Sequence, residues 1–333
     1  MNGSDDAAHG RHHLLLIGGA GYIGSYLLQR LVADGYHVDV CDDGRRGYPL
    51  GPVRYGCAYA DLTDRTLGQY SHVLWFAGVP SVRLAMQDPL AALENNCVHL
   101  YQLARRIRRG TRFVYASTGS LYSSAPGSDD RTLCDEAQPI LPGGNAYDVG
   151  KFAFDYIASG FLTDYIGLRM GTVSGFSPNL RPELIFNAMN VSAASRGVVE
   201  VSNPAAKRSL LFLTDLYRTV RKCVDLERCP NGFFNIASLN STIGAIADEI
   251  AAHHGAMVRY VDGPATYSFA MSTERAKTTL GVQFDAILSR QCDDFCAAWA
   301  GLDSQRRDRR NRVPRVRFTA VDAGTRHGGA GSR

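Results

Sequence analysis

The chain has 333 residues, of which 45% are apolar and 20% charged, with a formal net charge of +4. This length suits a main core with a smaller second part. No uninterrupted apolar run approaches membrane-spanning length, and residues 1–13 lack a signal-peptide core, so we expect a cytoplasmic protein with no membrane contact.

Strands and helices alternate along the first half of the chain. An apolar strand at 14–17 precedes a helix at 22–33, and further strands are expected at 37–41, 57–60, 72–77, 112–117 and 165–170. A long helix is expected at about 90–109, and another carries Tyr147. The fold class is therefore predicted to be α/β, with a doubly wound parallel sheet that helices cover on both faces.

The alternation of strands and helices becomes irregular after Gly175, where Pro178, Pro182 and Pro204 divide the chain into short segments. We expect a disordered segment at 1–12 and the sheet domain at 13–175. Residues 176–303 are expected to form mainly a smaller part, with some strands and helices returning to the core. A basic disordered tail is expected at 304–333.

The tail carries most of the positive charge. It holds nine arginines and two aspartates, which leaves the rest of the chain slightly negative. Such a tail can contact nucleic acid or a membrane, but a solvated tail with no specific partner is the favoured interpretation.

Cysteines and histidines give no sign of a metal site. The eight cysteines are scattered and contain no Cys-x-x-Cys pair, which favours reduced thiols. The histidines gather near the start (His9, His12, His13) and at His253 and His254, without metal-ligand spacing to acids or cysteines. We therefore predict no bound metal.

The first strand runs into glycines spaced three apart, Gly18, Gly21 and Gly24. Such glycines let the backbone turn tightly and approach a pyrophosphate, whose charge then lies at the amino end of the next helix. Asp42 follows at the end of the second strand, at the spacing where a carboxylate binds the adenosine ribose. The pattern predicts a dinucleotide site.

Asp42 favours NAD over NADP, because a carboxylate there repels a 2′-phosphate. Arg45 and Arg46 lie close by and weaken this preference, since an arginine can accommodate the extra phosphate.

Tyr147 and Lys151 are four residues apart, which places both side chains on one face of a helix. An ammonium beside a phenol favours the phenolate, so Tyr147 is a candidate base near neutral pH. Behind a dinucleotide-binding turn, this pair indicates an oxidoreductase site.

Taken in order, these motifs resemble the extended short-chain dehydrogenase/reductase family, in the branch of nucleotide-sugar enzymes that contains UDP-galactose 4-epimerase. The resemblance runs from about Leu14 to Gly281. It implies a Rossmann-type sheet, an NAD cofactor, a nucleotide-sugar or nucleoside substrate and a smaller C-terminal substrate-binding part. It also implies a homodimer, formed by the 90–109 helix and the Tyr147 helix.

The resemblance assigns roles to individual residues. Thr118, Tyr147 and Lys151 would be catalytic, and Asn187, Arg208 and Thr118 would bind substrate. Asp61 would reach the adenine amino group, and Asn96 would support Lys151. The implied cofactor-binding residues are Gly18, Gly21, Tyr22, Ile23, Gly24, Asp42, Asp43, Asp61, Leu62, Phe76, Ala77, Gly78, Asn96, Ser117, Tyr147 and Lys151.

The two residues after Thr118 bear on the reaction. Sugar dehydratases of this family carry an acidic pair there, and the related decarboxylases a glutamate at the second position, whereas this chain has Gly119 and Ser120. An epimerase that acts through a transient keto intermediate is the favoured interpretation. A net oxidoreductase, such as a keto-sugar reductase or sugar dehydrogenase, is the alternative, and a dinucleotide-sensing protein without activity is the least favoured.

The substrate residues match the family less well. Arg208 matches one of its two pyrophosphate-binding arginines, but no arginine occurs from Val261 through Thr273 to supply the second. The substrate is therefore expected to be an unusual nucleotide sugar, or a nucleoside without a diphosphate.

Overall fold

A computed structural model describes residues 12–44, 58–124 and 133–312. At its centre is a six-stranded sheet in which every neighbouring pair is parallel. Its strands, in spatial order, are β2 (His37–Cys41), β1 (His13–Ile17), β3 (His72–Trp75), β4 (Arg112–Thr118), β5 (Tyr165–Met170) and β9 (Gly232–Ile236). In the sheet, β2 lies on one side of β1, and β3 lies on the other side. In doubly wound sheets, this reversal of strand order opens a crevice at the carboxyl ends of the strands.

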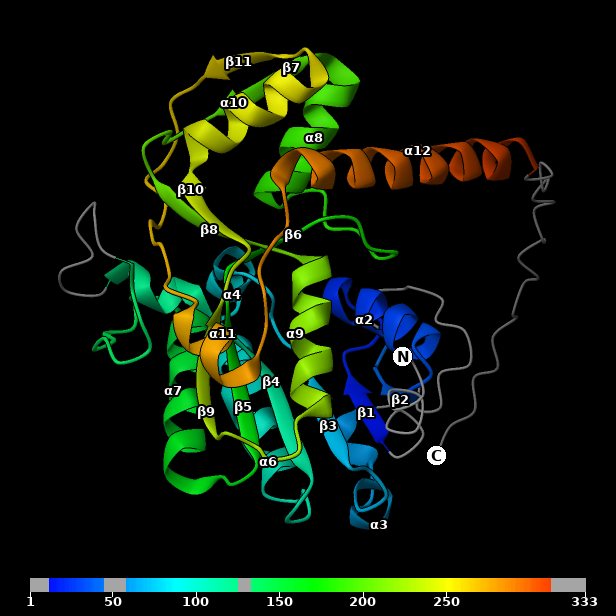
Figure 1. The fold of residues 1–333 in the computed structure, drawn as a ribbon, viewed down its shortest axis with the longest axis vertical. Helices are drawn as coiled ribbons and strands as arrows, with labels where there is room; N and C mark the ends of the chain where they lie inside the picture. The colour runs from blue at the N-terminus through cyan, green and yellow to red at the C-terminus, as the bar shows by residue number, and fades with distance from the viewer. Residues whose placement is uncertain (1–11, 45–57, 125–132, 313–333) are drawn as a thin grey trace, which may run out of the picture.

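Helices cover both faces of this sheet (Figure 1). On one face, Leu14 and Leu16 of β1 join a core that includes α2 (Tyr22–Ala33), α9 (Leu213–Asp225) and α11 (Glu274–Leu280). On the other face, Leu15 and Ile17 join a core with α6 (His99–Ala104) and α7 (Ala146–Phe161). Alternate residues of a strand point to opposite faces, so a strand buried on both faces is continuously apolar. The predicted fold class is confirmed.

A smaller part lies beyond the carboxyl ends of the main strands (Figure 1). It holds a three-stranded sheet, β10 (Leu239–Thr242), β8 (Lys207–Phe212) and β6 (Thr172–Ser174), and a two-stranded one, β11 (Met257–Tyr260) and β7 (Val198–Val201). Phe186, Phe212, Ile246 and Phe295 share its core. They come in part from three helices, α8 (Ile185–Arg196), α10 (Ile243–His254) and α12 (Leu288–Arg312). The chain returns to the main sheet in β9.

Three expected elements differ from the structure. The strand expected at 57–60 is wrong for its described residues, because a short 3₁₀ helix, η1 (Tyr59–Asp61), leads directly into α3 (Asp64–Leu67), which the Thr63 side chain caps. The 90–109 helix is instead α5 (Pro89–Leu93), a π turn η2 (Glu94–Val98) and α6, ending at Ala104. Another short helix, α4 (Val82–Gln87), precedes it.

The third difference concerns the basic tail, expected to be disordered from residue 304. The structure continues α12 to Arg312, in keeping with the good helix propensity of arginine and glutamine. Residues 313–333 lie outside the described residues, as do Arg45 and Arg46. No helix within the described part of the chain is long and apolar enough to cross a membrane.

Candidate active site

The glycine turn between β1 and α2 is packed too closely for side chains. Gly18 has φ +86°, and a Cβ there would lie 2.5 Å from the Ala77 nitrogen. A Cβ on Gly24 would lie 2.0 Å from the Gly18 carbonyl oxygen. Only glycine allows this approach of strand, turn and helix. The local sequence therefore fixes where the amino end of α2 lies.

That helix end is open to an anion. Gly21 caps α2 without a side-chain hydrogen bond, and the first turn contains no acidic residue. The Asp42 carboxylate accepts hydrogen bonds from the backbone nitrogens of Ala20 at 2.8 Å and Gly44 at 2.9 Å, which ties the end of β2 to the glycine turn. An uncapped helix amino end attracts a phosphate group.

A continuous cleft runs along the carboxyl ends of the strands. Its first half, the cofactor half, is lined by residues that include Gly18, Gly21, Tyr22, Ile23, Asp42, Asp43, Tyr59, Trp75, Phe76, Ala77 and Gly78. Its second half, the substrate half, shares Phe76 to Pro80 with the first and extends to Ser117, Thr118, Ser120, Tyr147, Lys151, Tyr267 and Phe269. Most of the predicted cofactor residues therefore face one cleft.

Four of the predicted cofactor residues do not line it, namely Gly24, Asp61, Leu62 and Asn96. Asp61 is exposed on η1, and Leu62 packs its side chain into the core, while the neighbouring Tyr59 faces the cleft instead. Asn96 is fully buried in the π turn, where its side chain donates to the Val79 carbonyl at 3.1 Å and accepts from the Val79 nitrogen at 3.0 Å. The Asn96 side chain therefore holds the loop after β3, and support of Lys151 by Asn96 stays a prediction.

Tyr147 lies in the first turn of α7, and Lys151 one turn further along the same face. Asn145 caps the helix by accepting from the Asp148 nitrogen at 2.9 Å. The Lys151 ammonium donates to the Ala116 carbonyl at 2.7 Å, which joins α7 to the end of β4. Both side chains line the substrate half, beside Thr118.

The charge states differ from the sequence expectation. Enclosure in the cleft raises the pKa of Tyr147 to about 12, although its hydrogen bond with Thr118 lowers it. Burial also lowers the pKa of Lys151 to about 8, against the attraction of Asp155. In the protein alone, loss of hydration therefore outweighs the effect that we expected from a neighbouring ammonium.

Thr118 belongs to a small hydrogen-bond network that the sequence analysis did not foresee. Its Oγ1 lies 2.8 Å from Ser120 Oγ, and the Ser120 hydroxyl donates to the Asp148 carboxylate. Asp148 is only 2% exposed, and its other oxygen accepts from Asn145 Nδ2 at 2.7 Å. In the sequence, the only hint of this network is an acid directly after Tyr147. Successive residues of a helix point in different directions, so the periodicity gave no reason to place Asp148 near the Tyr147 face.

Comparison with known proteins identifies the family. A sequence profile described as the NAD dependent epimerase/dehydratase family matches residues 14–237, more than half of the chain. The chain belongs to this family. Its cofactor is accordingly NAD, and the glycine turn and open α2 amino end fit that group.

Curated relatives carry several activities. The chain is 32% identical to a probable UDP-arabinose 4-epimerase from Arabidopsis thaliana, over 68% of this chain and 64% of the relative. It is 26% identical to a UDP-glucose 4-epimerase from Halalkalibacterium halodurans, over 50% of this chain and 53% of that one. It is 25% identical to a dTDP-glucose 4,6-dehydratase from Neisseria gonorrhoeae, over 76% of this chain and 83% of the relative. The match spans less than two thirds of the first two relatives.

Solved structures share the fold of this family member. The NAD-dependent NDP-hexosamine 5,6-dehydratase TunA has a TM-score of 0.75 at 21% identity, covering 87% of this chain and 98% of TunA. The UDP-glucose 4-epimerase of Thermus thermophilus, solved with NAD, has a TM-score of 0.70 at 19% identity. The match covers 87% of this chain and 99% of the epimerase. At these identities the likeness concerns the fold, and both reaction types occur on it.

Of the three predicted substrate residues, Thr118 lines the cleft, whereas Asn187 and Arg208 lie outside its lining. Asn187 is fully buried. Its side-chain oxygen accepts from the Gly175 nitrogen at 2.9 Å, and its side-chain nitrogen donates to the Arg181 carbonyl at 2.9 Å. Arg208 is 4% exposed and lies under the Tyr267 ring, 4.2 Å from its centroid. One of its terminal nitrogens donates to Thr266, and the other has no partner among the described residues. Tyr267 and Phe269 occupy the cleft wall instead.

Arg181 is a cation of the cleft that sequence reasoning missed. It follows β6 and lines both halves. Its guanidinium donates to the Pro80 carbonyl at 3.2 Å and pairs with Glu183 at 2.8 Å. No periodic or motif signal marks it, because its place depends on the packing of an irregular segment.

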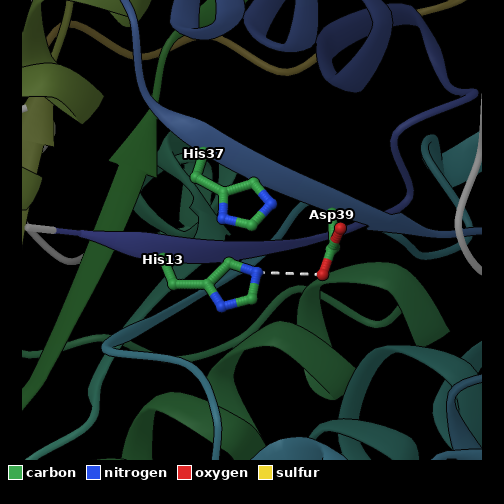
Figure 2. A group of neighbouring side chains, drawn as sticks. All are labelled: His13, His37 and Asp39. Carbon is green, nitrogen blue, oxygen red and sulfur yellow. Dashed lines mark hydrogen bonds and ion pairs between the residues drawn. The ribbon is translucent and has the colours of Figure 1, made fainter. Parts of the chain in front are cut away.

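Histidines meet an acid at the opposite end of the sheet, where the sequence analysis predicted no metal site. His13 Nε2 lies 2.9 Å from Asp39 (Figure 2). Asp39 also accepts a hydrogen bond from the Tyr70 hydroxyl at 2.8 Å. The His13 and His37 rings are stacked 4.0 Å apart with 4° between their planes. One ligand atom of each of His13, His37 and Asp39 lies within 4.8 Å of the other two, so the three side chains are close enough to share a cation, and the absence of a metal stays a prediction.

Proposed function

We propose that this protein is an NAD-dependent epimerase of a nucleotide sugar, or of a related sugar-nucleoside. Membership of the family and the epimerases among its curated relatives support this reaction. Dehydratases are also among them, so the choice depends on the residues around Thr118.

The observation that carries the proposal is the crowding at Gly119. A Cβ there would lie 2.5 Å from the Met271 sulfur and 2.9 Å from the Phe269 ring. Both of these side chains are buried, so an acidic side chain at this position would require Met271 and Phe269 to shift. None of the described residues that line the substrate half is Asp or Glu. Among the described residues, the substrate half therefore offers no carboxylic acid in direct contact with a leaving hydroxyl, which elimination of water requires.

The chain's own residues then have the following roles. Tyr147 takes the proton from a sugar hydroxyl and later returns it, and Thr118 hydrogen-bonds the same sugar oxygen. Lys151 holds the cofactor ribose. NAD, when bound, supplies the acceptor and later the donor of a hydride. Since none of the described side chains of the substrate half is an acid that could expel water, the keto sugar keeps its substituents and is reduced on either face.

Recognition of the nucleotide is assigned to Arg208. Its unpartnered nitrogen and its pKa, which burial lowers, describe a cation that lacks a counter-ion. A diphosphate is a natural partner for a guanidinium. Because Tyr267 covers Arg208, this contact requires the Tyr267 ring to turn aside.

Product analysis tests the proposed function. The protein, supplied with NAD, is incubated in D₂O with UDP-glucose or UDP-arabinose, and the products are identified by NMR. We expect an equilibrium mixture of epimers without deuterium on carbon, and no activity in Tyr147→Phe. A product that has lost water or gained carbon-bound deuterium would indicate a dehydratase. Reduced cofactor accumulating in step with product would indicate a net oxidoreductase.

A further inference from the structure

Arg208 is a buried cation whose hydrogen-bonding capacity is only partly used. It lies on β8 and is 4% exposed, and one terminal nitrogen, Nη2, donates to Thr266 Oγ1 at 3.1 Å. The other terminal nitrogen, Nη1, is buried and has no hydrogen-bond partner among the described residues. Burial of a charged donor without an acceptor is costly, which indicates a partner that the chain itself does not supply.

Two aromatic rings lie between the Arg208 guanidinium and the cleft. The central carbon of the guanidinium lies 4.2 Å from the centroid of the Tyr267 ring and 5.9 Å from that of the Phe269 ring. Both rings line the substrate half, whereas Arg208 does not. The two ring centroids are 6.0 Å apart with 18° between the planes, so the rings form one aromatic wall. A ligand in the cleft therefore meets this wall before it can reach the guanidinium.

Tyr267 is the ring of this wall that is free to turn. It is 42% exposed, whereas Phe269 is 4% exposed. The backbone beside it is held, because the Lys207 nitrogen donates to Ser268 Oγ at 2.9 Å. Exposed side chains change rotamer within nanoseconds. Rotation of the Tyr267 side chain towards solvent is therefore enough to uncover Arg208, with the backbone left in place.

The Tyr267 ring and an anion compete for the same guanidinium. A cation over an aromatic face is held by a weak attraction, whereas a phosphate oxygen makes a charge-assisted hydrogen bond to the unused N–H. A diphosphate therefore gains more from Arg208 than is lost when the ring turns aside. A nucleoside without phosphate has no anion to offer, so displacement of the ring brings it no gain.

We propose that Tyr267 is a specificity-determining residue, whose ring covers Arg208 until a ligand that carries a diphosphate displaces it. This inference rests on the proposed function, in which Arg208 binds the nucleotide. Only molecules with the ring turned aside can bind such a ligand through Arg208. If these are about one tenth of the total, the apparent Kd is about ten times the intrinsic value. Removal of the ring should therefore strengthen binding, although Tyr267 lines the site.

The affinity for UDP measures this effect without turnover. Calorimetric titration of the NAD-loaded protein compares wild type with Tyr267→Ala, and uridine serves as the ligand without phosphate. We expect the Kd of UDP to fall about tenfold in Tyr267→Ala, and that of uridine to stay within about twofold. Tyr267→Phe keeps the ring, and Tyr260→Ala removes a 60% exposed ring of β11 outside the cleft lining, so both controls should bind UDP like wild type. Unchanged or weaker binding of UDP by Tyr267→Ala would overturn the proposal.

A double-mutant cycle shows whether the effect depends on Arg208. Arg208→Met removes the charge and keeps an unbranched side chain in the buried position. In this background, Tyr267→Ala should no longer strengthen UDP binding, since the group that it uncovers is absent. Titration with NAD checks that each variant is folded. An equal gain in both backgrounds would contradict the proposal, because the ring would then obstruct the ligand directly.

Chemical modification tests the covering of Arg208 with its guanidinium intact. Phenylglyoxal reacts with accessible guanidinium groups, and mass spectrometry of peptides follows the reaction at Arg208. We expect Arg208 to react about tenfold faster in Tyr267→Ala than in wild type, and UDP but not uridine to slow the reaction. Equal rates in the two proteins would refute the role of Tyr267, whichever reaction the enzyme catalyses. The expected binding of UDP without conversion of any UDP-sugar would refute the proposed epimerase reaction alone.

Discussion

Gly119 and Met271 are so close that a Cβ on Gly119 would lie 2.5 Å from the Met271 sulfur. The two residues come from the turn after β4 and from the segment before α11, and both segments contribute side chains to the lining of the substrate half. Met271 is fully buried and its nitrogen donates to Ser209 Oγ at 3.1 Å, so this wall is fixed to β8. The packing of Met271 in the smaller part therefore restricts which side chain can occupy position 119, directly after Thr118.

Introducing an acid at this position should therefore damage the protein without creating a dehydratase. We expect Gly119→Asp to lower the free energy of unfolding by about 1–3 kcal/mol, because Met271 and Phe269 must shift. Urea unfolding measures this effect. Gly160→Ala on α7 is the control, since a Cβ there meets nothing within 4 Å. A Gly119→Asp variant of wild-type stability that releases a dehydrated sugar would show that the site is more adaptable than we infer.

Lys151 should destabilise the fold at neutral pH. Its pKa falls from the usual 10.5 to about 8, so between these pH values the folded chain binds fewer protons than the unfolded one. Stability therefore rises with pH through this window, and the cost is fully present below about pH 8. We expect Lys151→Met to stabilise the protein at pH 7 by about 1–3 kcal/mol, less the lost bond to Ala116, and to abolish activity. A variant less stable than wild type at pH 7 would contradict this account.

Asp42 should set the preference for NAD. Its carboxylate accepts from the Ala20 and Gly44 nitrogens, and asparagine retains an acceptor oxygen for one of these bonds. We expect Asp42→Asn to narrow the ratio of NAD to NADP affinity by about tenfold, because repulsion of the 2′-phosphate is lost. Fluorescence titration with both cofactors measures the ratio. If the wild type bound NADP more tightly than NAD, the predicted role of Asp42 in cofactor preference would be contradicted.

Much of the predicted site depends on local signals. The apolar run Leu14–Ile17 followed by spaced glycines predicts a strand, a turn and a helix amino end, since those conformations depend on the residues themselves. The spacing of Tyr147 and Lys151 likewise places them on one helical face. The structure brings both sets to one cleft.

The remaining residues could not be placed in this way. Tyr267 and Phe269 reach the cleft on an irregular segment, and Arg208 is buried because that segment covers it. Asn96 lies in a π turn that directs its side chain to the loop after β3, and the sequence gives no sign of this turn. Each position results from long-range packing, which leaves no periodicity in the sequence.

Dimerisation remains a prediction, and the helices expected to form the interface expose apolar side chains. Phe154 is buried, but Tyr156 and Phe161 of α7 are 70% and 78% exposed, and Leu90 of α5 is 79% exposed. We expect light scattering to give about twice the 36.3 kDa chain mass, and Tyr156→Glu to produce monomers. A wild type that is monomeric at micromolar concentration would leave these side chains as solvated surface.

The fate of one labelled hydrogen tests the central claim most directly. UDP-glucose carrying deuterium on carbon 4 is converted by the NAD-loaded protein, and the product is examined by NMR. A redox-neutral epimerase returns the deuterium to carbon 4 on the opposite face, which is the result that we predict. Deuterium found on another carbon of the sugar, or lost to the released cofactor, would contradict the assignment.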